Sequence, residues 1–370
     1  MTLTSRERVQ KLLAFEEADR IAKQDAYWED TLTRWHGEGL PVDANVKDYF
    51  GLDFDNIYID ASLRFPERLV EETDEFTVRE DKHGFVGKQW KGKAGALGYL
   101  DHTIKTRQDW EQHRHRLTVD FGGTSRVHHI SYFEPFTAYP TWEEMGEIFQ
   151  SMRKNERFIL LHVYGPHEAN WRRHGFEETL VDMALDPGFI AEMSLAHADL
   201  VIETVKKAEQ FGIKPDGLFF AEDLGINTGP MFSPKLYDKT LFEAHRRLGE
   251  FLHANDITYF IHTDGDMRRF IPRLIEAGVQ VLEPLEAKAG LDVRKLKEEY
   301  GRSLTFMGNI DVQKMSGSAT EIEEEVRSKL AVAMKGGGYI YHSDHSVPPT
   351  VSFEDYCRLM SLLDRYGSYQ

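Results

Sequence analysis

The chain has 370 residues, of which 41% are hydrophobic and 29% charged, as is usual for a globular protein with a large core. Its net charge of −17 leaves no basic face for nucleic acid or an anionic membrane, and disfavours a polyanionic substrate unless arginines cluster locally. The single cysteine, Cys357, excludes an intrachain disulfide and a thiolate-rich metal site.

The first residues of the chain are polar, and no run approaches the roughly 18–20 apolar residues that a bilayer-spanning helix needs. Ser5 is expected to cap a first helix whose apolar side carries Val9, Leu12 and Leu13. Because neither a secretion signal nor a membrane span is visible, we expect a cytoplasmic protein.

Eight short apolar or β-branched runs recur along the chain, most of them separated by amphipathic stretches. They cover residues 20–23, 56–59, 158–163, 217–221, 258–261, 279–282, 304–307 and 339–341. Apolar strands that alternate with helices are typical of a parallel sheet buried on both faces, and eight of them fit a closed barrel. We therefore predict an α/β protein with a single (β/α)8 TIM-barrel domain over residues 1–370. An open doubly wound sheet is the alternative, but no glycine-rich phosphate fingerprint follows the first strand.

Three helices are marked by their boundaries. Ser233 and Pro234 are typical of a helix start, residues 321–334 form a periodic stretch that stops at three glycines, and residues 355–366 end at Gly367.

One stretch, about residues 66–152, is too long for a single connection between a strand and the next. Within it, residues 76–80 and 85–90 flank a turn at 81–84 and predict an antiparallel hairpin. We interpret the stretch as an insertion above the barrel mouth that forms a pocket wall or a homodimer contact.

Acidic and imidazole side chains follow almost every predicted strand, where catalytic groups of such barrels gather. From these strand ends we select Asp60, His262, Asp344 and His345 as catalytic residues. Substrate-binding candidates are Tyr27, Trp28, Tyr164, Glu283 and Glu286, and metal-ligand candidates are Glu222, His262, Asp264 and His345.

Nitrogen and oxygen donors that converge on one barrel mouth suit a Zn²⁺-like site, and they equally suit acid–base catalysis without metal. Asp344 and Glu283 could orient an imidazole from outside the ligand set. Structural roles compete with each assignment. Glu222 and Asp223 would also serve as caps of the following helix, and Tyr27 and Trp28 as core aromatics.

Several motifs resemble the uroporphyrinogen decarboxylase superfamily, in order and over nearly the whole chain. They are TSRERV (residues 4–9) with ADRI (18–21), HTDGD (262–266), GNID (308–311), GGGYI (336–340) and SDHSVP (343–348). The resemblance implies a barrel enzyme of one of two kinds. One kind decarboxylates uroporphyrinogen in porphyrin biosynthesis without a cofactor, and the other transfers methyl groups to or from a corrinoid on a partner protein, usually with zinc.

The decarboxylase branch places an arginine-rich segment after the first strand to bind an octacarboxylate. Here residues 24–30 read QDAYWED and contain no arginine, although Asp60 could match the branch's pyrrole-binding aspartate and His345 its C-terminal histidine. The methyltransferase branch often has a His-x-Cys pair after strand five and a later cysteine. This chain offers His262, Asp264 and His345 at those places.

Oxygen-rich ligation makes a harder Lewis acid than a thiolate site and suits an ether or alcohol oxygen. We therefore expect a metal-dependent methyltransferase that demethylates a small, methoxylated substrate (O-demethylation) and passes the methyl group to a corrinoid protein. The alternatives are uroporphyrinogen decarboxylase, which is a lyase, and a barrel that only binds a ligand or corrinoid protein.

Overall fold

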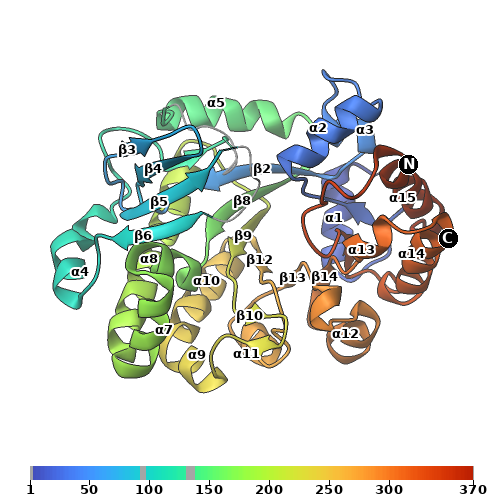
Figure 1. Ribbon diagram of the computed structural model, residues 1–370. Coiled ribbons are helices and arrows are strands. Elements are labelled where there is room, and N and C mark those ends of the chain that lie inside the picture. The colour runs from blue at the N-terminus through green and yellow to red at the C-terminus, as the bar shows by residue number, and fades with distance from the viewer. Residues whose placement is uncertain (1–2, 92–96, 131–137, 370) are drawn as a thin grey trace.

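The computed structural model describes residues 3–91, 97–130 and 138–369 (Figure 1). Its centre is a barrel of eight parallel strands, one for each predicted apolar run. They are β1 (Ala22–Lys23), β2 (Phe54–Ile59), β8 (Phe158–Tyr164), β9 (Gly217–Ala221), β12 (Thr258–His262), β13 (Val281–Glu283), β14 (Thr305–Met307) and β15 (Tyr339–Tyr341). The strands pair in the order β1-β15-β14-β13-β12-β9-β8-β2, so the predicted (β/α)8 barrel is confirmed.

The barrel closes between Lys23, the last residue of β1, and Asp53, which immediately precedes β2. The amide of Asp53 donates to the carbonyl of Lys23 (2.8 Å), and the Asp53 carboxylate accepts from the Lys23 amide (2.7 Å). Beyond this point β7 (Val127–His128) pairs antiparallel with the end of β2. An insertion strand therefore lies beside β2 near the barrel mouth.

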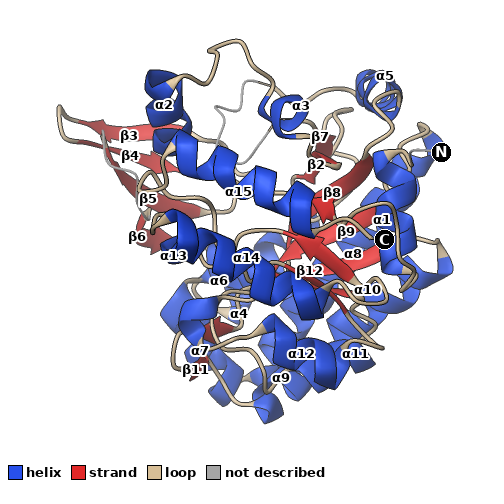
Figure 2. Ribbon diagram, turned by 90° about the vertical axis from the view of Figure 1, so that its right-hand side faces the viewer, coloured by secondary structure: helices blue, strands red, loops and turns tan. Residues whose placement is uncertain are grey.

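Helices cover the outside of the strands (Figure 2). After β1 and β2 come α2 (Glu29–Glu38), α3 (Val46–Phe50) and α5 (Trp142–Arg153), and after β8 come α6 (Pro166–His174), α7 (Phe176–Leu185) and α8 (Pro187–Gln210). The second half has β10 (Gly225–Ile226), β11 (Gly229–Pro230), α9 (Pro234–Thr240), α10 (Phe242–Ala254), α11 (Ile271–Glu276), η2 (Ala287–Ala289), α12 (Val293–Tyr300), α13 (Val312–Met315), α14 (Ala319–Ala333) and α15 (Phe353–Tyr366). Helices α14 and α15 pack against each other (Figure 2).

The predicted helix signals agree with the structure except at the first helix. Ser233 caps α9, and Gly367 ends α15. Helix α1 (Ser5–Leu13) is capped by Thr4, not by Ser5, because the Thr4 hydroxyl accepts from the Glu7 amide and the Glu7 carboxylate accepts from the Thr4 amide.

The inserted segment after β2 forms a four-stranded antiparallel sheet on the left of Figure 1. It contains β3 (Arg68–Glu72), β4 (Phe76–Glu80), β5 (Phe85–Trp90) and β6 (Gly98–His102), followed by α4 (Arg107–His113) and η1 (Arg114–Arg116). The predicted hairpin is confirmed with its expected bounds as β4 and β5. Trp90, Leu69 and Leu100 are exposed on this sheet.

Apolar side chains fill the amino end of the barrel interior, and we call this cluster the barrel plug. It consists of Val9, Leu12, Ala22, Phe54, Phe158, Leu160, Phe260, Val281, Met307 and Ile340. Val9 and Leu12 belong to α1, which therefore closes the bottom of the barrel. The larger apolar core lies between the strands and the surrounding helices. In the described ranges, no helix has the length and apolar character to cross a bilayer.

Candidate metal and substrate site

A cavity of about 410 Å³ opens at the carboxyl ends of the barrel strands. We call it the carboxyl-end cavity. Many of its lining residues lie two apart on a strand, such as Asn56 and Tyr58 on β2, because alternate residues of a strand point to the same face. The polar and aromatic lining residues include Gln24, Asp25, Tyr27, Trp28, Asn56, Tyr58, His162, Phe219, His262, Asp264, Glu283, His342 and His345.

His262, the last residue of β12, is held by a carboxylate from the next strand. Its Nδ1 lies 2.5 Å from Oε2 of Glu283 on β13, its register partner. Burial alone would lower the pKa of His262, but Glu283, Asp264 and Asp223 outweigh burial and raise that pKa well above its ordinary value. The site therefore favours a positive charge at His262.

The other ring nitrogen of His262 faces two more carboxylates. Its Nε2 lies 3.6 Å from Oδ1 of Asp223 and 3.7 Å from Oδ1 of Asp264. Nε2 of His345 lies 3.9 Å from Oδ2 of Asp264, so the two imidazoles approach the same carboxylate from β12 and from the loop after β15. The two rings that the sequence places far apart therefore meet at one rim.

Two groups of donor atoms in this region are compact enough to hold a metal ion. Asp223, His262 and Asp264 form one group, and Asp264, Glu286 and His345 form the other, with the donor atoms of each group within 4.8 Å of one another. Asp264 belongs to both groups. Its Oδ1 is buried and accepts no hydrogen bond from any residue that the structure describes.

The pKa of Asp264 is raised to about 6. Burial and the negative charges of Asp223 and Glu286 raise this pKa by more than His262 and His345 lower it. A buried, unpaired carboxylate oxygen among several acids is costly unless a cation or proton is close. The donor set of carboxylate oxygens and imidazole nitrogens is one that Zn²⁺ accepts, and these residues therefore fit a metal ion.

Glu286 is engaged more tightly than the other members. Its Oε2 accepts from the Gly265 amide (2.8 Å), and its Oε1 pairs with Lys288 (2.6 Å). Gly265 has φ +77°, and a Cβ there would lie 2.4 Å from the carbonyl carbon of Gly225. Only glycine fits at this position. The hydrogen bond from the Gly265 amide to Glu286 holds the loop that carries Asp264.

Glu222, predicted as a metal ligand, is not at this site. Its carboxylate accepts from the amides of His167 and Glu168 at the start of α6 and from Nε2 of His245 (2.8 Å). Ala221 points into the cavity, so Glu222 points outward into the helix layer, and Asp223 returns to the cavity rim. The prediction was wrong by one residue. Glu222 does bind the start of a helix, but this helix is α6, which precedes it, and not the following helix that the competing interpretation named.

Asp60, predicted as catalytic, lies outside the lining of the carboxyl-end cavity. Its carboxylate accepts from Arg64 Nε (2.8 Å), with Lys82 at 3.6 Å and Arg126 at 4.0 Å. Burial would raise the pKa of Asp60, but the nearby cations Lys82, Arg126 and Arg64 hold it well below its ordinary value. Asp60 therefore acts as the anion of a buried ion-pair cluster, and the catalytic assignment is corrected.

Asp344, also predicted as catalytic, binds backbone. Its two oxygens accept from the amides of Ala287 and Val312 (2.9 Å each), and the residue is buried. It therefore ties the loops after β13 and β14 together and does not orient His345. The expectation that Asp344 orients an imidazole is therefore wrong, whereas Glu283 does hold His262.

Two of the three aromatic predictions line the cavity. The ring of Trp28 stacks on His345 with centroids 6.1 Å apart, and the Tyr27 hydroxyl shares a hydrogen bond with Tyr356 (2.8 Å). Tyr164 does not line it, because its ring lies under the guanidinium of Arg172, 4.0 Å away. Its substrate-binding assignment is corrected.

Lining residues that were not selected from the sequence include Gln24, Asn56, His162 and His342. Gln24 and His342 immediately follow β1 and β15, and Asn56 and His162 lie within β2 and β8. Asn56 lies two residues from Tyr58, and His162 two residues from Leu160, as residues on the same face of a strand do. A polar residue inside an apolar strand was the available signal.

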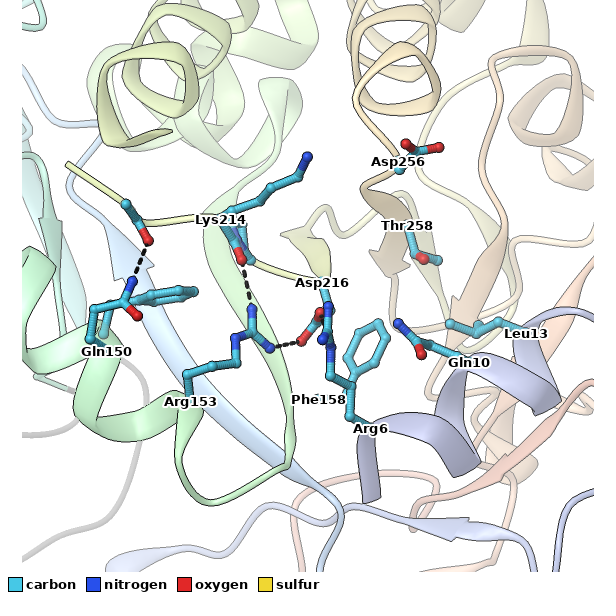
Figure 3. Close-up of a pocket in the computed structure, with 13 residues that line it drawn as sticks. Arg6, Gln10, Leu13, Gln150, Arg153, Phe158, Lys214, Asp216, Asp256 and Thr258 are labelled. Carbon is cyan, nitrogen blue, oxygen red and sulfur yellow. Dashed lines mark hydrogen bonds and ion pairs between the residues drawn. The ribbon is translucent and has the colours of Figure 1, made fainter. Parts of the chain in front are cut away.

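A second cavity, of about 500 Å³, lies at the amino ends of β8 and β12 (Figure 3). Three of its charged groups pair with one another, since Arg6 and Arg153 both bind Asp216 at 2.8 and 2.5 Å. The Gln150 side chain donates to the carbonyl of Gly212 (2.8 Å). This cavity is larger, but none of its described lining residues has a buried polar atom without a hydrogen bond, whereas Gln24, Asn56, His162 and Asp264 of the carboxyl-end cavity do.

Comparison with known proteins agrees with the motifs. The profile of the family described as uroporphyrinogen decarboxylase (URO-D) matches residues 171–366, more than half of the chain. The chain belongs to the uroporphyrinogen decarboxylase family. The match covers the segment that carries Asp223, His262, Asp264 and His345. No curated protein sequence matches the chain.

Among solved structures, a methyltransferase from Methanosarcina mazei is similar in fold. The similarity covers 98% of this chain and 99% of that chain, with a TM-score of 0.62 and 13% sequence identity. A psychrophilic family 10 endo-beta-1,4-xylanase, with a TM-score of 0.37, covers 61% of this chain at 10% identity. The methyltransferase shares its fold with this chain over almost the whole length, whereas the similarity to the xylanase is too low to indicate a common overall fold.

Proposed function

We propose that this member of the uroporphyrinogen decarboxylase family is a metal-dependent methyltransferase that moves a methyl group from a small methoxylated substrate to a corrinoid on a partner protein. The observation that carries the proposal is the cluster of imidazole and carboxylate donors around Oδ1 of Asp264, which accepts no hydrogen bond from any described residue. A cavity of about 410 Å³ beside the cluster suits a small molecule.

Asp223, His262, Asp264 and His345 would hold the metal, with Glu286 supporting the loop of Asp264. This is the ligand set predicted from the sequence, with Asp223 in place of Glu222. When bound, the metal supplies a Lewis acid that polarises the ether oxygen of the substrate.

The protein's own residues orient this site. Glu283 accepts a hydrogen bond from Nδ1–H of His262, which directs Nε2 of the ring toward Asp223 and Asp264. Trp28 stacks on His345 and limits the movement of that ring. Trp28 and Phe219 also give the cavity apolar walls, which exclude water from the reacting bond.

The transfer is a displacement at carbon. The bond between the methyl carbon and the ether oxygen breaks, the carbon is bonded to the partner's corrinoid, and the electron pair stays on the oxygen. That oxygen leaves as an alcohol or phenol after taking up a proton from water. The enzyme's share is orientation of the methyl group toward the open rim and stabilisation of the leaving oxygen.

Decarboxylation of uroporphyrinogen is not favoured by the site. An octacarboxylate needs cationic partners, and none of the described residues that line the cavity is lysine or arginine. Asp60, which that alternative requires in the cavity, is paired with Arg64, Lys82 and Arg126 outside it.

The test uses purified protein loaded with Zn²⁺, a methoxylated phenol carrying a deuterated methyl group, and cob(I)alamin as a free form of the corrinoid. We expect the label to appear on cobalamin with the wild type and not with His262→Ala. Conversion of uroporphyrinogen to coproporphyrinogen, with no methyl transfer, would contradict the proposal. Binding of the phenol without transfer of label by either protein would favour the binding-only barrel.

A further inference from the structure

The side of the carboxyl-end cavity formed by β1, β2 and β8 carries three buried polar atoms without hydrogen-bond partners. The metal-ligand candidates lie at the ends of other strands, β9, β12 and β15. Oε1 of Gln24, Oδ1 of Asn56 and Nε2 of His162 make no hydrogen bond with any described residue. All three residues line the cavity. A buried polar atom left without a partner is destabilising, so three in one cavity indicate a ligand that forms hydrogen bonds there.

These residues come from neighbouring strands of the barrel. Gln24 follows β1, Asn56 lies in β2 and His162 lies in β8, which pairs with β2. The same pairing sets Tyr58 opposite His162. Their shared location on the inner face of the β1–β2–β8 side gives one patch, which we call the amide subsite (Gln24, Asn56 and His162).

An aromatic wall connects the amide subsite to the metal-ligand candidates. The ring of His162 lies 4.4 Å from that of Phe219, measured between centroids, and the ring of Phe219 lies 5.9 Å from that of His262. Tyr58 extends the wall on the other side of His162, at 5.3 Å. A molecule that spans the cavity therefore passes over rings and is expected to be flat and apolar in its middle.

The charge of the cavity restricts the group that the amide subsite binds. Burial lowers the pKa of His162 to about 3, so its imidazole is neutral near neutral pH. Two amides and a neutral imidazole offer hydrogen bonds but no charge. Asp25, Asp264 and Glu283 line the same cavity, and no described lining residue carries a positive side chain other than a histidine. A carboxylate or phosphate at this end would have no cation to pair with.

We propose that Gln24, Asn56 and His162 form the recognition subsite for an uncharged hydrogen-bonding group, of the phenol-hydroxyl type, at the end of the substrate opposite its methyl group. This proposal rests on the proposed function for the position of the methyl group. A hydroxyl donates one hydrogen bond and accepts others, so one such group donates to one of the two amide oxygens and accepts from Nε2–H of His162. The substrate class is thereby an uncharged hydroxylated aryl methyl ether.

The test measures binding of three probes by calorimetry: para-methoxyphenol, methoxybenzene and para-methoxybenzoate. We expect para-methoxyphenol to bind about tenfold or more tightly than methoxybenzene, because methoxybenzene leaves the buried polar atoms without partners. The benzoate is expected to bind more weakly than the phenol. In Asn56→Leu and Gln24→Met, the ratio between phenol and methoxybenzene is expected to fall toward one.

The matched control is Gln150→Met, which removes an amide at the opposite end of the barrel (Figure 3) and is expected to keep the wild-type ratio. Thermal unfolding of each variant confirms that it is folded. Equal affinity for the phenol and methoxybenzene in the wild type, or no binding of either, would overturn the subsite. Tightest binding of the benzoate would overturn its uncharged character.

Each titration is carried out with and without Zn²⁺, which separates the two proposals. A hydroxyl preference that survives without zinc, and disappears in Asn56→Leu, supports the subsite even if no methyl transfer is found. Zinc binding and methyl transfer without any hydroxyl preference would leave the proposed function intact and overturn the subsite.

Discussion

The amino end of the barrel interior is filled with apolar side chains, whereas the carboxyl end is lined with imidazoles, amides and carboxylates. The same strands supply both ends, and alternate residues of each strand point inward along its whole length. Phe260 and His262 lie two apart on β12, and Leu160 and His162 lie two apart on β8. On the inner face of these two strands, an apolar packing residue is therefore followed two positions later by a histidine of the cavity.

The largest expected effect is on stability and comes from the barrel plug. Phe260 is fully buried, so Phe260→Ala is expected to lower the free energy of unfolding by about 3–5 kcal/mol, measured by urea denaturation. Its matched control is Phe219→Ala at the cavity, where the half-buried ring is expected to cost less. A larger loss of unfolding free energy in Phe219→Ala than in Phe260→Ala would contradict the assignment of the amino end to packing and of the carboxyl end to function.

The next effect is on metal affinity and compares two buried carboxylates that each bind a histidine. Glu283→Gln is expected to weaken Zn²⁺ binding about 10–100-fold, because it loosens the orientation of His262. Glu222→Gln breaks the pair with His245 in the helix layer and is expected to leave Zn²⁺ affinity unchanged. Competition with a chelating dye measures both, and equal weakening in the two variants would place Glu222 back at the site.

The strands and part of the candidate site could be predicted from the sequence alone. All eight strands and the hairpin were predictable, because apolar runs and turn residues are local signals. His262, Asp264 and His345 were predictable from their place after the strands. The choice between Glu222 and Asp223 was not, since the turn after β9 decides which of two adjacent acids faces the cavity. Asp60 and Asp344 were misassigned because their partners, Arg64, Lys82 and distant backbone amides, come together only in the folded chain.

A smaller effect concerns pH and the amide subsite. The folded protein holds the pKa of His162 at about 3, below its ordinary value of 6.5, so the unfolded chain binds a proton that the folded one rejects between these values. The stability contributed by neutral His162 is present above pH 6.5 and is lost as pH falls, by up to about 2 kcal/mol at pH 5.

His162→Gln removes this titration, and its unfolding free energy is expected to fall less than that of the wild type between pH 7 and pH 5. Other histidines titrate equally in both proteins and cancel in the difference. Parallel curves in urea denaturation would contradict a neutral, buried His162.

The smallest expected effect is at Asp344. Asp344→Asn keeps one acceptor for two backbone amides, so it is expected to cost about 1 kcal/mol in stability and to leave Zn²⁺ affinity and methyl transfer unchanged. Loss of methyl transfer in a variant as stable as the wild type would restore Asp344 as a catalytic residue.

Zinc binding by Asp264→Asn is the sharpest test of the metal site, because Asp264 belongs to both groups of donor atoms and the change keeps the shape of the side chain. Protein dialysed against buffered free Zn²⁺ is analysed by metal emission spectroscopy, beside the wild type. We predict one zinc per wild-type chain and less than about a tenth of that in the variant at the same free Zn²⁺. Equal zinc in both proteins, or none in either, would contradict a metal site at the carboxyl end of this barrel.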